Sequence, residues 1–104
     1  MAEIIWTESA LADLDAIADY IAIENPSAAR TFVARAFGHV GQLAKRPRSG
    51  SMPPELQPDD RYRQIIEPPC RVLYRYDGMR IFIVHIMRSE RLLDTARLVK
   101  SSDR

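Results

Sequence analysis

The sequence predicts a small α+β domain in which an N-terminal strand and an antiparallel two-helix hairpin precede a mainly antiparallel sheet. Apolar residues recur at spacings of three and four over residues 8–44, and at a spacing of two over residues 61–87. A loop over residues 45–60, with four prolines and a Ser-Gly-Ser, separates the two patterns. The expected order is β-α-α-β-β-β, followed by a short helix over Arg91–Lys100. With 104 residues, the chain has room for one domain, 1–104, around one core.

Capping residues bound the helical hairpin. Glu3–Trp6 is short and β-branched, which favours a first strand, and Thr7 then offers its hydroxyl as the N-cap of the first helix. Asn25-Pro26 ends this helix and begins the second, because asparagine caps well and proline is tolerated at the first helical position. The two helices are therefore expected to lie antiparallel, one acidic and one basic on the outside.

The core is predicted from the apolar stripes of both helices and one face of the sheet. We expect these side chains to be buried: Leu14, Ile17, Ile21, Phe32, Phe37, Val72, Tyr74, Ile81 and Ile83. Gly38 and Gly41 interrupt the second helix, and each costs about 1 kcal/mol relative to alanine. They mark either a close helix crossing along a stripe with Ala34 or simple tolerance.

Three strands follow the loop, and their pairing depends on one turn. They are predicted at Arg61–Glu67, Cys70–Tyr76 and Arg80–Met87. Asp77-Gly78 is a strong hairpin signal, because a two-residue turn of this kind needs positive φ at both positions. This turn would place Arg75 opposite Arg80 and Tyr74 opposite Ile81.

The register predicts two different faces of the sheet. One face packs against the helices, whereas the other has an apolar floor of Leu73, Phe82 and Val84 within a basic rim of Arg71, Arg75, Arg80 and Arg88. Opposed arginines disfavour the hairpin by roughly a few tenths of a kcal/mol unless an acid lies between them. That acid comes from a partner or from within, from Asp13, Asp15 or Asp19. Because an exposed apolar floor is unusual without a ligand, we expect a partner to bind this face.

The charge distribution supports a partner more than a catalyst. Net charge is only +1, but residues 28–50 carry five bases and no acid, and thirteen of the fifteen bases are arginine. Arginine suits bidentate contact with carboxylate or phosphate, whereas solvated faces and genome composition are the plain alternative. The chain has no signal peptide and no apolar stretch long enough to span a bilayer, so we expect a cytoplasmic protein without membrane contact.

Catalytic and metal-binding patterns are weak. A single cysteine, Cys70, excludes an internal disulfide, and with only two histidines beside it a zinc site is disfavoured. No sequence motif indicates nucleotide binding, so we expect no metal or cofactor. The hairpin register places His85 on the helix-facing side near Ile83 and Met87, as a core residue. A bulge before Met87 would instead turn His85 outward beside Arg71.

The order of elements and several motifs together resemble the RelE/ParE toxin superfamily, and within it the ParE branch. The resemblance covers nearly the whole chain, although Cys70 stands where the family pattern usually has an aromatic residue. The matching pieces are I-I-W-T-E-S-A-L-A-D-L (Ile4–Leu14), D-Y-I-A (Asp19–Ala22), Asn25-Pro26, R-P-R-S-G (Arg46–Gly50), P-E-L (Pro54–Leu56), P-C-R-V-L-Y-R (Pro69–Arg75) and I-F-I-V-H-I-M-R (Ile81–Arg88).

The resemblance implies the toxin of a type II toxin-antitoxin system, which inhibits DNA gyrase by binding and is neutralised by a cognate antitoxin. An acidic and apolar antitoxin segment is expected on Arg71, Leu73, Arg75, Arg80, Phe82 and Val84, and the target on Arg88 and Arg91. The alternatives are a RelE-like endoribonuclease that cuts messenger RNA in the ribosome, and an inactive orphan binding module. The nuclease is the less favoured hypothesis, because the sequence is rich in cationic side chains but offers few groups for proton transfer.

Overall fold

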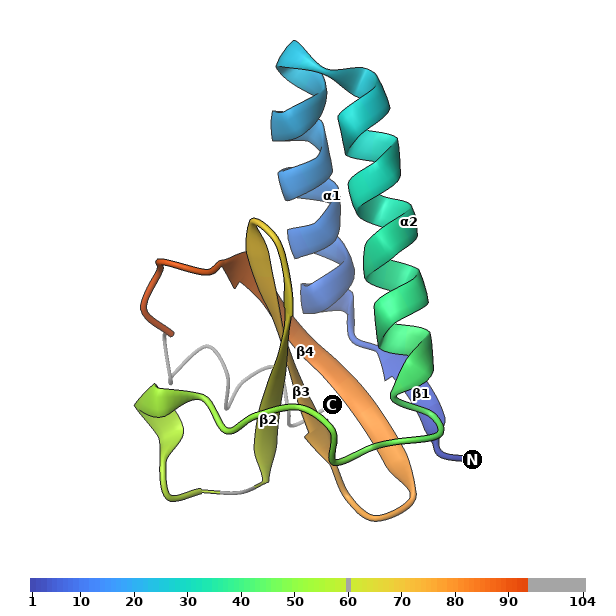
Figure 1. Cartoon of the computed structure of the whole chain (residues 1–104), viewed down its shortest axis with the longest axis vertical. Coiled ribbons are helices and arrows are strands. Elements are labelled where there is room, and N and C mark those ends of the chain that lie inside the picture. Colours follow the sequence, from blue (N-terminus) through green and yellow to red (C-terminus); the bar gives the residue numbers. More distant parts are fainter. Residues whose placement is uncertain (60, 94–104) are drawn as a thin grey trace.

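The computed structural model describes residues 1–59 and 61–93 and confirms the predicted α+β architecture. Figure 1 shows the two helices side by side, reaching past one end of a twisted sheet. Of the final helix predicted over Arg91–Lys100, the structure describes only residues 91–93, and these are not helical. The rest of that prediction, from residue 94 onward, lies outside the described residues. In chain order the elements are β1 (Glu3–Trp6), α1 (Glu8–Glu24), α2 (Pro26–Gln42), the 3-10 helix η1 (Pro54–Leu56), β2 (Tyr62–Glu67), β3 (Cys70–Tyr76) and β4 (Arg80–Arg88).

The sheet has four strands in the order β1-β4-β3-β2. β2, β3 and β4 form an antiparallel meander, and β1 joins its edge parallel to β4. A parallel pair needs a long crossover connection, and here the helices and the first two meander strands lie between its members. Ile4 and Trp6 of β1 face the helices, whereas Ile5 faces the opposite side.

The predicted caps of both helices are confirmed. The Thr7 hydroxyl accepts a hydrogen bond from the Ala10 amide at 3.2 Å and donates one to the Ile83 carbonyl at 2.8 Å, so the cap also fastens α1 to β4. The Asn25 amide donates to the Ile21 carbonyl at the end of α1, and its side chain accepts from the Ala28 amide at 3.0 Å at the start of α2.

Most of the predicted core is confirmed, and the prediction is wrong for one residue, Phe37. Leu14, Phe32 and the four predicted strand residues are buried, while Ile17 and Ile21 pack at its margin. Phe37, however, is 45% exposed and lies beside the Trp6 ring, with ring centroids 4.7 Å apart. The helix α2 buries a narrow stripe of Ala29, Phe32, Ala36 and Val40. Phe37 follows Ala36 and is rotated about 100° away from that stripe.

The predicted hairpin register is also wrong, although its assignment of faces near the turn is kept. Tyr76 pairs with Ile81 and Arg75 with Phe82, so Arg75 does not oppose Arg80 in the ladder. The Asp77 carboxylate accepts from the amides of Met79 and Arg80, and the Asp77 amide donates to the Arg80 carbonyl. Asp77 therefore ends the ladder, and Gly78, with φ of 96°, is the first loop residue.

A β-bulge shifts the register at the middle of the hairpin. Tyr74 pairs with Ile83 but Leu73 pairs with His85, which leaves Val84 as an extra residue in β4. His85 stays on the helix side, as predicted, and Ile86 joins the same core. Met87, expected beside His85, instead lies in the cluster on the opposite face.

The glycines of α2 do not mark a close helix crossing. Both are exposed, and a Cβ built on Gly38 or Gly41 would meet no atom within 4 Å. The simple-tolerance alternative therefore fits the packing of α2.

Candidate functional site

A groove runs between α1 and the C-terminal end of β4. It encloses about 750 Å³, and its walls mix apolar and charged side chains. The lining residues are Asp13, Ala16, Ile17, Tyr20, Ile21, Pro69, His85, Ile86, Met87, Arg88, Arg91 and Leu92. This volume is in the range of ligand pockets, and an open groove between a helix and a strand suits a peptide segment.

A buried polar contact holds the two walls of the groove together. The Asp13 carboxylate accepts from the Ile86 amide at 3.0 Å and lies 2.5 Å from Nδ1 of His85. With the Asp13 carboxylate ionised, Nδ1 of His85 is the donor in this contact. The Asp13 side chain is 12% exposed and the His85 side chain is 6% exposed. The pair ties α1 to β4 just beyond the bulge and leaves little of the imidazole at the surface.

The rim of the groove combines exposed apolar and exposed basic side chains. Tyr20 is 71% exposed and Leu92 is 84% exposed, which are large fractions for such side chains. Arg88 and Arg91, the predicted target-binding pair, are exposed at the same groove. Nε of Arg88 lies 2.6 Å from the Glu90 carboxylate, and this hydrogen bond raises the pKa of Arg88 and lowers the pKa of Glu90. The contact is exposed to water, so a partner carboxylate can compete for Arg88.

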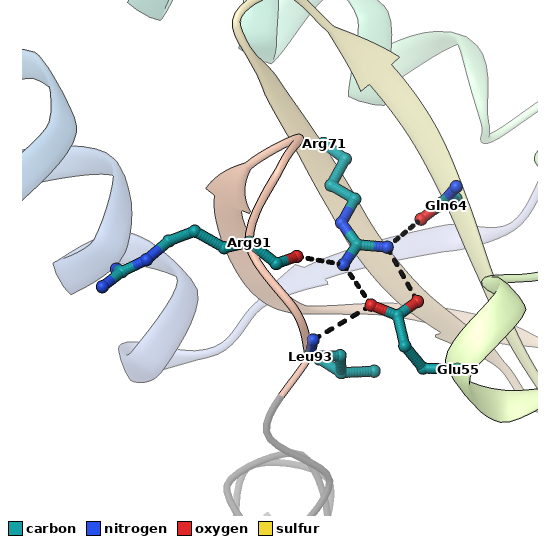
Figure 2. Close-up of polar contacts among 5 residues, drawn as sticks. All are labelled: Glu55, Gln64, Arg71, Arg91 and Leu93. Carbon is teal, nitrogen blue, oxygen red and sulfur yellow. Dashed lines mark hydrogen bonds and ion pairs between the residues drawn. The ribbon is translucent and has the colours of Figure 1, made fainter.

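Arg71 lies on the other face of the sheet, and both terminal nitrogens of its buried guanidinium bind other groups of the chain (Figure 2). Its guanidinium donates to both carboxylate oxygens of Glu55, to the Gln64 side chain at 2.9 Å and to the Arg91 carbonyl at 2.6 Å. Glu55 also accepts from the Leu93 amide at 3.0 Å. The hydrogen bonds from Arg71 are the main cause that lowers the pKa of Glu55 from 4.5 to about 2. We call this network the Arg71 clamp.

The predicted exposed floor of this face is wrong. Leu73, Phe82 and Val84 are 1%, 9% and 0% exposed. They form a second core cluster with other apolar side chains that cover them: Ile5, Leu56, Tyr62, Met87 and Leu93. The cover comes partly from η1 and from the segment after β4, which the Arg71 clamp fastens down.

Two of the predicted basic residues stay at the surface of this face. The guanidinium carbons of Arg75 and Arg80 lie 4.6 and 5.6 Å from the centroid of the Phe82 ring. Arg75 and Arg80 are not paired across the strands, but both contact the Phe82 ring through cation-π interactions. Of the six residues predicted to bind the antitoxin, only Arg75 and Arg80 remain partly or fully exposed.

Sequence reasoning missed four residues of these sites. Tyr20 and Leu92 carried no sign of a groove, because an isolated exposed apolar residue is common. Asp13 lies off the apolar stripe of α1 and was named only as a possible counter-charge for the opposed arginines, whereas it contacts His85. Glu55 lies in a Pro-rich loop that also carries Asp59 and Asp60, so its charge alone did not single it out.

The described part of the chain also limits other chemistry. Among residues 1–59 and 61–93, no group of three or more His, Cys, Asp or Glu side chains is placed to hold a metal ion. No helix in the same residues is long and apolar enough to cross a membrane. Burial raises the pKa of the Cys70 thiol, which makes this side chain a poor nucleophile.

Comparison with known proteins gives consistent matches. The family described as the ParE toxin of type II toxin-antitoxin system, parDE, matches residues 4–93. Toxin RelE2 of Caulobacter vibrioides is 35% identical over 94 residues, which cover 88% of this chain and all of that protein. A chain from the chromosomal ParDE TA system of P. aeruginosa superposes with a TM-score of 0.71 at 31% identity, over 86% of this chain and 98% of that one.

Proposed function

Because the chain belongs to the ParE toxin family of type II toxin-antitoxin systems, we propose that it arrests growth by binding DNA gyrase through the groove of α1 and β4. Membership of this family implies a cognate antitoxin. We further propose that an acidic, amphipathic segment of that antitoxin fills the same groove. Neutralisation then follows from occlusion, since the antitoxin covers the surface that gyrase would contact.

The observation that carries the proposal is the pairing of exposed apolar and basic groups at one groove. An incoming helix or strand could bury Tyr20 and Leu92 while its carboxylates meet Arg88 and Arg91. Exposed aromatic and arginine side chains are the types that most often dominate binding energy. Charge attraction would mainly speed the encounter, and apolar burial would supply affinity.

The surface of Arg75 and Arg80 over Phe82 is a second proposed antitoxin contact. Its two guanidiniums converge on one ring, an arrangement that suits a carboxylate of the partner. The buried members of the original prediction, Leu73 and Val84, have no surface to offer in the described chain.

The test compares two doubly substituted proteins of equal net charge. Arg88→Ala with Arg91→Ala removes the basic rim, and Arg30→Ala with Arg35→Ala removes two exposed arginines of α2. In a gyrase supercoiling assay, we expect the rim variant to need about tenfold or more protein for the same inhibition. The α2 variant should inhibit like the wild type. Equal inhibition by both variants would contradict a role for the rim.

A second candidate function is cleavage of messenger RNA in the ribosome. It is favoured by one observation: the Asp13–His85 pair lies on the same groove as Arg88 and Arg91, and an oriented histidine is a common general base. The same purified protein should therefore be added to translating ribosomes. Cleavage of messenger RNA that His85→Gln abolishes would replace the gyrase proposal, and no effect on either target would indicate an inactive binding module.

A further inference from the structure

A strongly basic loop follows α2 at the end of the sheet away from the groove. Lys45, Arg46 and Arg48 are all exposed there, within a stretch of 23 residues, 28–50, that contains no acid. Figure 1 shows this loop, in green, crossing the strands below the helices. Residues 45–50 are called the basic loop below.

The sheet holds the basic loop in one conformation. The Tyr74 hydroxyl donates to the Pro47 carbonyl at 2.7 Å and accepts from the Gly50 amide at 3.0 Å. Arg63 donates to the carbonyls of Arg48 and Gly50, at 3.3 and 2.9 Å, and so adds a fourth cation beneath the loop. Gly50 fits tightly, because a Cβ there would lie 2.6 Å from the Gln64 carbonyl oxygen. The cations are therefore presented by a fixed backbone.

The surface over the basic loop combines charge with an aromatic ring and open hollows. The guanidinium carbon of Arg48 lies 5.0 Å from the centroid of the Tyr76 ring. Arg46 borders two shallow hollows of about 420 and 480 Å³, one beside Tyr76 and the other over Gly38 and Gly41. The glycines of α2 thus leave space next to the cations, where side chains would otherwise stand.

The three exposed cations have no counter-charge within the described chain. Over residues 1–59 and 61–93, the ion pairs of basic side chains involve other groups, and no carboxylate contacts Lys45, Arg46 or Arg48. The C-terminal end of α2 nearby carries a partial charge of about −0.5, which the cations outweigh. Among the described residues, the surface is therefore a positive patch without a neutralising carboxylate, and it borders two shallow hollows.

We propose that the basic loop binds the sugar-phosphate backbone of a nucleic acid. Positive charge without pairing attracts phosphate independently of sequence, and an aromatic ring beside it offers a face for a base or a sugar. The loop packs against Tyr76, which pairs with the first residues of β4, whereas the groove lies at the last residues of β4. A nucleic acid on the loop and a protein in the groove could therefore be bound together.

The test measures binding of the purified full chain to a short labelled DNA duplex and to an RNA hairpin of equal length, by fluorescence polarisation between about 50 and 200 mM salt. Arg46→Gln with Arg48→Gln removes two cations of the loop. Arg30→Gln with Arg35→Gln is the matched control, with the same net charge. The thermal midpoint of both variants shows that each is folded.

We expect the loop variant to bind about tenfold more weakly at low salt, with a plot of log K against log salt that is shallower by roughly two units. The control should bind like the wild type. Tighter binding of the duplex would assign the ligand to DNA, and tighter binding of the hairpin would assign it to RNA. Equal weakening of both variants, or no salt-dependent binding to either probe, would overturn the proposal. None of these readouts involves gyrase or an antitoxin.

Discussion

The two faces of the sheet are covered by different kinds of structure. On one face, α1 and α2 lay continuous apolar stripes across Val72, Tyr74 and Ile83. On the other, the cover is a short 3-10 helix and an irregular segment after β4, fastened through Arg71 and Glu55. The first face is held by dispersion and burial over regular elements, and the second depends on one buried ionic network. We therefore expect the two faces to be destabilised by different substitutions.

The largest expected effect is on the helix-covered face. Phe32→Ala should lower the free energy of unfolding by about 3 to 5 kcal/mol, because Phe32 is 6% exposed and its removal leaves a cavity. Phe37→Ala, in the same helix, should cost about 1 kcal/mol, since that ring is 45% exposed. Urea denaturation of both variants measures the contrast. Similar losses would mean that the burial of α2 does not follow its Ala29–Val40 stripe.

The second effect breaks the clamp of the opposite face. Arg71→Met should destabilise the protein by about 3 kcal/mol, because it leaves the Glu55 carboxylate without its main donor and releases the Arg91 carbonyl. Hydrogen exchange at the Leu93 amide should rise more than at the Ile83 amide, which lies in the ladder.

A double substitution sharpens this result. Arg71→Met with Glu55→Leu should recover most of the stability, since a well-packed apolar pair can replace a buried ion pair. Nε of Arg71 is buried and has no hydrogen-bond partner among the residues that the structure describes, so the guanidinium is incompletely satisfied even in the wild type. A double variant as unstable as Arg71→Met alone would show that the clamp stabilises through its hydrogen bonds to Gln64, Arg91 and Leu93, which apolar burial does not replace.

The same difference between the faces explains what could be predicted from the sequence. Helical and strand periods, with the caps at Thr7 and Asn25, predicted the elements and the helix-facing core. Period and capping are local properties, so they can be recognised without a structure. The covering of Leu73 and Val84 is not local: it depends on contacts with Leu56 and Leu93, which carry no periodic signal.

The candidate site was predicted only in part. Arg88 and Arg91, which were predicted to act together, both line the groove, but its other wall includes Tyr20 of α1, a helix that the Asp13–His85 contact joins to β4. The hairpin register failed because the Asp77 side chain moved the turn by one residue, and the bulge at Val84 then changed it again. The turn and the bulge both depend on local contacts within a few residues. The alternation of apolar and polar residues along a strand does not reveal such contacts.

The smallest effect concerns acid pH and again separates the two faces. The pKa of Glu55 is about 2 in the folded protein and 4.5 ordinarily, so between these values the unfolded chain binds more protons than the folded one. Stability from this group is complete above about pH 4.5 and is lost as pH falls toward 2. The loss should be smaller than that in Arg71→Met, because protonation of Glu55 leaves the hydrogen bonds from Arg71 to Gln64 and to the Arg91 carbonyl in place.

The measurement is the free energy of unfolding from pH 6 down to about pH 2, for the wild type and for Glu55→Gln. Glu55→Gln removes the titrating group while keeping its shape, so its curve should fall less steeply over this interval. Other carboxylates with a lowered pKa, such as Asp59 and Asp77, titrate in both proteins and cancel in the comparison. The Leu93 amide should lose protection first as acid is added, while the Ile83 amide keeps it. Parallel curves for the two proteins would mean that the Glu55 charge does not hold the second face closed.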